Sequence, residues 1–380
     1  RTVLALCVLA YFGSRVGQIA ISPLIPEITT TFEVSKASIG TALTGMWIAY
    51  ALVQFPAGVF GDRFGERPVV LVSLAIGVVG SVVLALSPSY QVFVIMVVVL
   101  GAGVGLYYNV GTILLARQTK NVGQVIGIHR IGGQAAGFLA PIAVAAVSVR
   151  YGWRTGLLVG AVAAFPALLL FWWGVRPTPP TMPDTRVRDR FDWKSTVNMF
   201  ARTGFVSTTM IATLAEFVGV AARSFIPTFL IEAHGLSLAM ASFLFSVYFV
   251  VIGIAQPMTG WVSDRSSRGL ATALTLIIGM IGYVMLVLGS SIGIITTGII
   301  FAAYAMSWSA PVQAKIIDIL SEDEQGTGFG IVRTLYILLG AFGSAVIGTI
   351  ADGFDWTTAF GVLAVILFMA VLILGVQSQL

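Results

Sequence analysis

Residues 54–63 read QFPAGVFGDR, and residues 256–265 read QPMTGWVSDR. Gln, Gly, Asp and Arg therefore recur in the same order, 202 residues further along the chain. A second set recurs at an offset of 203 residues, in which Gly127, Ile128, Arg130, Gly137 and Trp153 return as Gly330, Ile331, Arg333, Gly340 and Trp356. The chain thus contains two copies of one long unit, and membrane proteins built from such repeats place their working site where the repeats meet.

The composition is that of a membrane protein. Hydrophobic residues form 57% of the chain and charged residues only 10%, whereas a typical soluble domain has about 25% charged residues. The lone Cys7 excludes an internal disulfide and a cysteine-based metal site. Because no other metal constellation, no nucleotide-binding loop and no nucleophile–base pair stands out, we expect no metal, no cofactor and no enzymatic activity.

Apolar runs between charged or Gly/Pro-rich breaks predict twelve transmembrane helices. They cover residues 2–31, 37–61, 68–87, 90–116, 122–149, 152–174, 197–232, 237–262, 269–289, 292–319, 325–350 and 356–376. Prolines within these runs, such as Pro23, Pro56 and Pro311, are expected to bend their helices. The predicted fold class is an all-α membrane protein of two pseudo-symmetric six-helix bundles.

The two bundles are predicted to comprise residues 1–175 and 196–380, joined by a polar linker. Residues 176–195 of this linker are rich in Pro, Arg and Asp. We expect a solvated tether, and a regulatory or lipid-binding segment is the alternative.

The short loops predict the orientation in the membrane, because cytoplasmic loops carry an excess of Lys and Arg. Thirteen basic residues lie on the side of the linker, whereas only Lys36, Arg150 and Arg154 lie on the other side. We therefore expect a multi-pass protein of the plasma or inner membrane, with the linker and both termini in the cytoplasm. This distribution also accounts for the net charge of +5 without a nucleic-acid partner.

The loop after the second predicted helix carries a family resemblance. Residues 58–68 read GVFGDRFGERP, which resembles the signature loop Gly-x-x-x-Asp-Arg-x-Gly-x-Arg of the major facilitator superfamily at every fixed position. The second half carries an incomplete copy that lacks the second Gly. Glycine runs at 101–105 and 326–330 also resemble that superfamily, and the first of them is a helix-packing signal.

The resemblance implies a transporter that works by alternating access, usually as a monomer in the lipid bilayer. It also implies that the signature loop latches the cytoplasmic ends of the two halves when the carrier faces outward. Gly58 would let two helices approach closely, and Arg117 is the expected partner of Asp62. The candidate gating residues are Gly58, Asp62, Arg63, Arg67, Arg117, Asp264 and Arg265. The alternative is that these residues only set the shape of the loop.

Ionisable residues inside the predicted spans are the main clue to the substrate. Five lie firmly inside: Arg15, Arg130, Glu216, Arg223 and Arg333. Four cations against one carboxylate call for compensation, since an isolated membrane arginine costs from about 3 to more than 10 kcal/mol. An anionic substrate would supply it, because a guanidinium binds carboxylate through two parallel hydrogen bonds.

Arg130 and Arg333 occupy matching positions in the two repeats, on the fifth and eleventh predicted helices. They could clamp one anion from opposite walls, or each could fasten its own half of the protein. Arg15 lies near the middle of the first helix with Gln18 on the same face. The resemblance places this helix beside the central cavity, which makes both residues substrate-binding candidates; an ion pair of Arg15 with Glu216 is the alternative.

Glu216 and Arg223 lie seven residues apart on one face of the seventh helix. Glu216 is the leading candidate for proton coupling, and a permanent salt bridge is the alternative. His129 is a further proton candidate, although a membrane histidine more often packs through a hydrogen bond. Sodium is an alternative coupling ion.

Tyr108, Asn109 and Trp308 are candidates for lining the substrate cavity, because oriented polar groups give an apolar pocket its specificity. Packing and interfacial anchoring are the alternative roles.

The sequence thus predicts a secondary active transporter, a proton symporter, for a small organic anion of the carboxylate type. The alternative is a multidrug or lipophilic-compound proton antiporter of the same fold. Gly133, Gly137 and Pro141 partly resemble the helix-5 motif of such antiporters, but Ala140 replaces the Gly that precedes the Pro.

Overall fold

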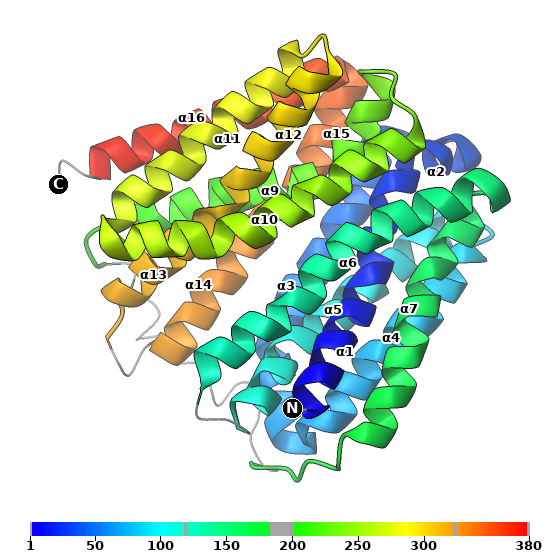
Figure 1. The fold of residues 1–380 in the computed structure, drawn as a ribbon, viewed down its shortest axis with the longest axis vertical. Helices are drawn as coiled ribbons and strands as arrows, with labels where there is room; N and C mark the ends of the chain where they lie inside the picture. Colours follow the sequence, from blue (N-terminus) through cyan, green and yellow to red (C-terminus); the bar gives the residue numbers. More distant parts are fainter. Residues whose placement is uncertain (1, 118–120, 183–198, 200, 322–324, 378–380) are drawn as a thin grey trace. The chain divides into compact units, whose positions relative to one another are not determined.

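A computed structural model describes residues 2–117, 121–182, 199, 201–321 and 325–377, and it contains helices but no strand within those ranges (Figure 1). The helices of the first half are α1 (Thr2–Ile19), η1 (Ser22–Leu24), α2 (Ile25–Phe32), α3 (Lys36–Phe64), α4 (Glu66–Ala85), α5 (Tyr90–Ala116), α6 (Val122–Tyr151) and α7 (Trp153–Gly174). Those of the second half are α9 (Phe205–Glu232), α10 (Leu238–Arg265), α11 (Arg268–Leu288), α12 (Ile292–Ala305), η3 (Met306–Trp308), α13 (Ser309–Ile319), α14 (Gln325–Gly340), α15 (Gly343–Gly353) and α16 (Trp356–Gln377).

Among the described residues, eleven helical segments are long and apolar enough to cross a membrane, and α3 adds a twelfth if its two parts form one span. α3 bends by 47° where Pro56 begins its second part, as the missing backbone donor of a proline explains. The predicted fold class is therefore confirmed. The start at residue 197 is wrong, because α9 begins at Phe205, directly after Gly204 with a left-handed backbone (φ 76°).

The chain forms two compact units. The first comprises Arg1–Val34, Ala42–Asp189 and Leu236–Ser246, and the second comprises Ser35–Thr41, Arg190–Gly235 and Val247–Leu380. The beginnings of α3 and α10 thus belong to a different unit from the rest of each helix. The boundaries proposed from the sequence stay a prediction, because residues 183–195 of the linker lie outside the described residues.

The first turn of α3 is held by polar groups of the second unit. The backbone N–H groups of Lys36 and Ala37 donate to the Asp352 carboxylate at 3.0 and 2.7 Å. The Lys36 ammonium also pairs with Glu232 at 2.9 Å. Both acids are therefore engaged in stabilising this helix start.

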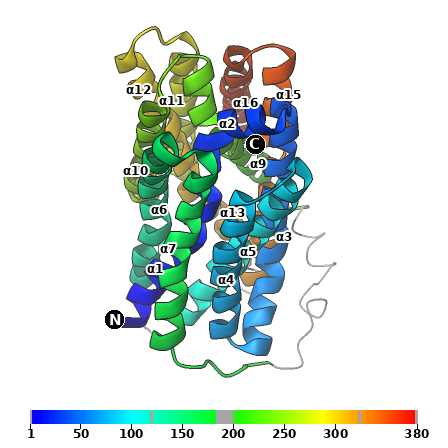
Figure 2. The same cartoon turned by 90° about the vertical axis from the view of Figure 1, so that its right-hand side faces the viewer.

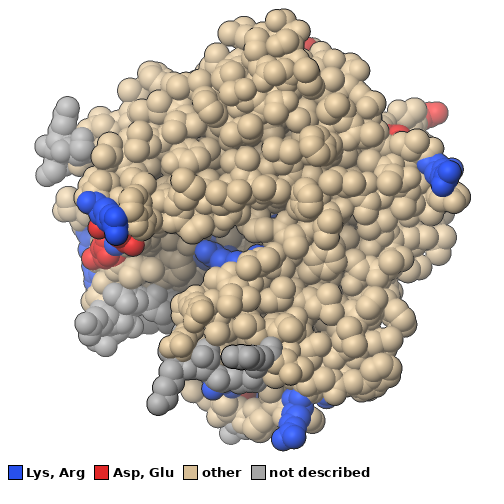
Figure 3. Space-filling view, in the orientation of Figure 1, with Lys and Arg blue, Asp and Glu red and all other residues tan. Residues whose placement is uncertain are grey.

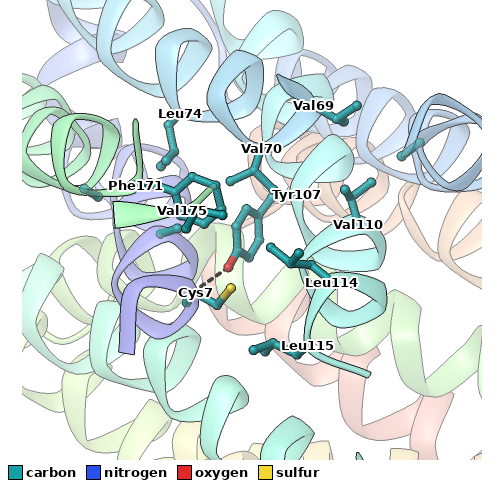
Figure 4. Packing of buried hydrophobic residues seen from close by; sticks show 13 residues of the cluster. Cys7, Val69, Val70, Leu74, Tyr107, Val110, Leu114, Leu115, Phe171 and Val175 are labelled. Atoms are coloured by element: carbon teal, nitrogen blue, oxygen red, sulfur yellow. Dashed lines mark hydrogen bonds between the residues drawn. The ribbon is translucent and has the colours of Figure 1, made fainter. Parts of the chain in front are cut away.

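In the first unit, α1 packs against α6 and α7, and α4 packs against α5 and α7 (Figure 2). Glycines allow these backbones to approach, since a Cβ on Gly160 of α7 would lie only 2.7 Å from the Cα of Gly17 on α1. The apolar core beside them includes Tyr107, whose hydroxyl donates to the Cys7 carbonyl at 2.5 Å (Figure 4). This bond ties α5 to α1 within the core.

The glycine run on α5 packs helices as predicted. A Cβ on Gly101 or Gly105 would lie 2.1 or 2.6 Å from a backbone oxygen of α3, and one on Gly103 would lie 2.5 Å from Ile76 of α4. A Cβ on Gly58 would meet no atom of the described residues within 4 Å, and the expected close approach of two helices at this position stays a prediction. In the signature loop the conformational requirement falls on Gly65, which has a φ of +86°.

In the second unit, α9 packs against α14 and α16, and α11 packs against α12 and α16. The rings of Phe229 on α9 and Phe360 on α16 stack with centroids 3.9 Å apart. α12 and α13 are separated by the short η3, which precedes Pro311 by a few residues. On the face shown in Figure 3, uncharged residues dominate and charged side chains gather in a few places, as suits a lipid-exposed surface.

Candidate functional site

The half-buried Arg15 and the buried Gln18 form a donor-rich pair on α1. The Arg15 Nη1 donates to the Gln18 Oε1 at 2.5 Å, so the amide oxygen of Gln18 is occupied. The Arg15 Nε and the Gln18 Nε2 are buried and have no hydrogen-bond partner among the described residues. Gln18 is only 4% exposed. This pair therefore offers hydrogen-bond donors without acceptors, which favours an incoming anion or carbonyl.

An aromatic cluster lies one turn before Arg15, where α1 meets α5 and α6. The Tyr11 ring stacks on Tyr107 with centroids 5.5 Å apart and is tilted against Tyr108 at the same distance. α6 can approach because a Cβ on Gly133 would lie 2.5 Å from the Tyr11 ring. The Arg130 Nε donates to the Tyr108 hydroxyl at 3.2 Å, which joins one guanidinium to this cluster.

Both predicted cations of the first unit act on this cluster. The charges of Arg15 and Arg130 and the hydroxyls of Tyr50 and Tyr108 all interact electrostatically with the Tyr11 hydroxyl. Arg130 is exposed and Arg15 is half-buried. The structure therefore brings Arg15, Tyr108 and Arg130 together around Tyr11, within one unit, and Gln18 joins them through its hydrogen bond with Arg15.

His129 faces the interior, on a different side of α6 from Arg130. It is fully buried, and its Nε2 lies 3.0 Å from the Tyr107 hydroxyl. Since the Tyr107 proton is donated to the Cys7 carbonyl, which can only accept, the Nε2 must donate to Tyr107. This geometry supports packing through a hydrogen bond, and a proton role for His129 stays a prediction.

Asn109 connects α5 to the bend of α3. Its Nδ2 donates to the Gln54 carbonyl at 2.7 Å, beside the position where Pro56 begins the second part of α3. Asn109 thus supports a proline bend, and its predicted contact with substrate stays untested.

In the second unit, Glu216 and Arg223 form an ion pair along α9. The Arg223 Nη2 lies 2.6 Å from the Glu216 Oε1, and both side chains are largely buried, at 17% and 14% exposure. Gly219 leaves room for this pair, because a Cβ there would lie 3.0 Å from the Arg223 Nη1. Both charges also act on the buried Tyr248 hydroxyl. Of the two alternatives for Glu216, this structure contains the salt bridge.

Arg333 lies on α14, and Trp308, at the end of η3, packs against the same helix. The Trp308 ring meets Tyr336 of α14 edge-on, with centroids 5.6 Å apart. Gln313 of α13 donates to the Tyr336 hydroxyl at 3.0 Å, and Arg333 is half-buried one turn before Tyr336. Because Arg130 and Arg333 belong to different units, the clamp stays a prediction.

The signature loop holds two buried acids around one cation. Asp62 and Glu66 are 7% and 1% exposed. Arg117, directly after α5, donates to Asp62 at 3.0 Å and also to Glu66. The expected contact between Asp62 and Arg117 is therefore present, and the predicted latching role stays a prediction. Arg63 is exposed and lies over the Phe64 ring.

The segment after α7 wraps the same loop. The backbone N–H groups of Thr181 and Met182 donate to the Asp62 carbonyl at 2.9 and 3.0 Å, and the Thr181 hydroxyl donates to the Asp62 carboxylate at 3.1 Å. The backbone N–H of Arg67 donates to the Thr178 hydroxyl at 2.9 Å. We call residues 178–182 the strap.

The second copy of the loop is built differently. Arg268, the first residue of α11, donates to Asp264 in the last turn of α10 and to Asp318 at 3.2 Å, but the two acids are 70% and 56% exposed. Arg265 lies over the Trp261 ring, 4.2 Å from its centroid. This copy is therefore a solvated charge cluster at the end of α10.

No group of three His, Cys, Asp or Glu side chains that could hold a metal ion occurs in the described part of the chain.

The family model of the Major Facilitator Superfamily matches residues 7–310 and 206–377, which together cover nearly the whole chain. The chain belongs to the Major Facilitator Superfamily. Its family and fold are those of membrane transporters.

Some curated relatives in this superfamily match less than half of the chain, and others match most of it. The Multidrug resistance protein B homolog of Mycobacterium tuberculosis is 31% identical over 169 residues, which is 43% of this chain and 31% of that protein. The Probable nitrate transporter NarT of Staphylococcus epidermidis is 23% identical over 91% of this chain and 90% of its own length. The Nitrite extrusion protein of Bacillus subtilis is 23% identical over 87% of this chain and 82% of its own length.

Solved transporter structures share the fold. A bacterial homologue of the human lysosomal transporter Spinster superimposes with a TM-score of 0.86 at 18% identity, covering 99% of this chain and 96% of that one. The superfamily resemblance is therefore confirmed at the levels of sequence family and fold.

Sequence reasoning missed Tyr11, Glu66 and Thr181. Tyr11 precedes Arg15 by four residues, which places both on one helix face, so this spacing could have revealed it. Glu66 stood inside the quoted loop, but it is not a fixed position of the superfamily motif. Nothing in the sequence indicated that Thr181 would return to Asp62.

Proposed function

We propose that this protein is a secondary active transporter that moves a small organic anion, of the carboxylate type, by alternating access. The observation that carries the proposal is Arg15, whose one hydrogen bond among the described residues goes to the neutral amide of Gln18. A guanidinium at the middle of a span costs about 3 kcal/mol or more when unpaired. A carboxylate bound by Arg15 and Arg130 would compensate that cost.

The charge pattern supports an anion over a lipophilic cation. A cation exporter needs an accessible carboxylate in its spans, and Glu216 is already paired with Arg223 at 2.6 Å. Nitrate and nitrite, which the printed names assign to two relatives aligned over most of their length, are anions. The multidrug relative aligns over less than half of this chain.

We further propose proton coupling at the ion pair of Glu216 and Arg223. Protonation of Glu216 removes its negative charge and frees the Arg223 guanidinium for the substrate. The variant Glu216→Gln should then exchange substrate across liposome membranes but lose accumulation driven by a pH gradient. Retained pH-driven accumulation would exclude Glu216 as the coupling site, and sodium-driven accumulation would identify the other coupling ion.

The substrate class is tested by ligand stabilisation and flux on purified protein. We expect acetate, benzoate, succinate or nitrate to raise the melting temperature and at least one of them to be taken up into liposomes. Arg15→Gln should abolish both effects, while the exposed Arg150→Gln at the end of α6 serves as the matched control. Arg333→Gln should also abolish uptake if the predicted clamp operates.

A different outcome selects the alternative function. Stabilisation by tetraphenylphosphonium or cationic dyes, with no response to any anion, would favour a multidrug exporter instead.

We also propose that the linker and both termini lie in the cytoplasm. Cleavage at a protease site inserted in the linker, in inside-out but not right-side-out vesicles, checks it.

A further inference from the structure

The aromatic cluster around Tyr11 has a buried interior and a half-buried edge. Tyr107 and His129 are fully buried, and Tyr50 is 7% exposed. Tyr11 and Tyr108 are half-buried, so they form the accessible edge of the cluster. The hydroxyl groups of Tyr107 and Tyr108 already engage Cys7 and Arg130 respectively.

The rings are arranged to accept a further planar group. Tyr11 is almost parallel to Tyr107, at 9°, whereas Tyr108 is inclined to Tyr11 by 49° with centroids 5.5 Å apart. Aromatic rings prefer stacked or inclined neighbours at centroid distances of about 4.5 to 7 Å. Both rings also neighbour His129, at centroid distances of 5.0 and 6.3 Å, so the apolar surface open to a ligand is the exposed part of the half-buried Tyr11 and Tyr108.

Cationic groups border these same two rings. The Arg130 Nε donates to the Tyr108 hydroxyl, and Arg15 lies one helical turn beyond Tyr11. Beyond Arg15, Gln18 contributes an amide nitrogen for which the described residues hold no acceptor. The first unit alone thus combines donors for a carboxylate with ring faces for the group attached to it.

We propose that the substrate is an aromatic monocarboxylate, whose carboxylate binds Arg15 and Arg130 and whose ring packs on Tyr11 and Tyr108. This inference rests on the proposed function and specifies its substrate class. A sugar acid fits less well, because its hydroxyl groups would lose hydrogen bonds to water and face apolar ring surfaces that do not replace them.

The decisive experiment compares two ligands on the unaltered protein. Benzoate and cyclohexanecarboxylate carry the same charge and the same number of carbons, but only benzoate is flat and aromatic. We expect benzoate to bind about five- to tenfold more tightly than cyclohexanecarboxylate, because this is the gain in affinity that one aromatic pair typically gives. Ligand-dependent melting curves and competition with radiolabelled benzoate uptake both measure this ratio.

Two variants locate the preference. Tyr11→Leu removes the ring, and Gly133→Ala displaces it through the 2.5 Å approach of the new Cβ. Both should reduce the ratio of benzoate to cyclohexanecarboxylate affinity to about twofold or less while acetate still stabilises the protein. Tyr11→Phe keeps the ring and should keep the ratio.

The outcomes separate this inference from the proposed function. Equal affinities for benzoate and cyclohexanecarboxylate would overturn the aromatic assignment and leave a carboxylate transporter. A ratio that survives Tyr11→Leu in a protein that still binds acetate would overturn the assignment to this cluster. No response to any anion, together with a response to cationic dyes, would overturn both proposals.

Discussion

The two copies of the signature loop share a sequence pattern but differ in their surroundings. In the first copy, Asp62 and Glu66 are buried and share Arg117. In the second copy, Asp264 and Asp318 are mostly exposed and share Arg268. Each copy has one arginine between two acids, so the charge arrangement is similar and the solvent exposure is not.

This difference in exposure determines how much each ion cluster contributes to the free energy of unfolding. Water screens the second copy, and exposed pairs typically contribute about 0 to 1 kcal/mol. In the first copy, the acids have lost their hydration and depend on protein donors, including Thr181 of the strap. The two copies therefore share a pattern of residues, but only the buried first copy is expected to contribute substantially to the stability of its unit.

The largest expected effect follows from removing the shared cation of the first copy. Arg117→Met takes the shared cation away from two buried carboxylates and should cost about 3 kcal/mol, near the lower end for buried pairs because Arg117 itself is 39% exposed. Cys7 is fully buried and is the lone cysteine. A thiol-reactive dye followed during heating therefore reports the loss of stability of the first unit.

A charge-free variant provides the control for this prediction. Combining Arg117→Met with Asp62→Asn and Glu66→Gln removes every charge of the cluster and should recover a large part of the lost stability. A melting temperature of Arg117→Met equal to that of the unaltered protein would mean that the acids find other compensation, and the contrast between the copies would then be unsupported.

The next effect concerns the backbone of the first copy. Gly65 has a φ of +86°, and a Cβ there would lie 2.1 Å from the Thr178 carbonyl oxygen of the strap. Gly65→Ala should therefore cost about 2 kcal/mol through backbone strain and displacement of the strap. Gly58→Ala is the matched control, because its Cβ meets no described atom within 4 Å. Equal melting temperatures for the two variants would contradict the prediction.

The fold could be predicted from the sequence because lipid imposes a strong constraint. A span must satisfy its own backbone hydrogen bonds and remain apolar, so hydropathy placed the helices within a few residues of the observed bounds. Pro56 marked the bend of α3 correctly. The start of α9 was missed because residues 199–204 mix apolar and polar types and give no clear hydropathy boundary. The left-handed conformation of Gly204 sets the helix start instead.

The site was predictable mainly along single helices. Helical spacing joined Arg15 to Gln18 and placed Glu216 in line with Arg223, and both pairs are hydrogen-bonded. Contacts between elements were less accessible, because they depend on which helices become neighbours. The family motif suggested Arg117 for Asp62, but the strap and the Tyr11 cluster required coordinates.

A smaller effect is expected from the strap. Thr181→Val keeps the volume of the side chain but removes its hydroxyl, which donates to the Asp62 carboxylate at 3.1 Å. Because the Asp62 carboxylate keeps its bond to Arg117, we expect a cost of about 1 kcal/mol. The same dye assay measures it, and Thr155→Val serves as control, since its hydroxyl donates at an exposed position to the Tyr151 carbonyl at the end of α6 and not to a buried carboxylate.

The smallest effect should come from the second copy. Arg268→Met removes the cation between Asp264 and Asp318, whose side chains are 70% and 56% exposed and remain hydrated. We expect a cost below about 1 kcal/mol that decreases further in high salt, because salt screens exposed charges. Tryptophan fluorescence during heating measures the stability at low and high salt. A loss as large as that of Arg117→Met, and independent of salt, would show that burial does not distinguish the two copies.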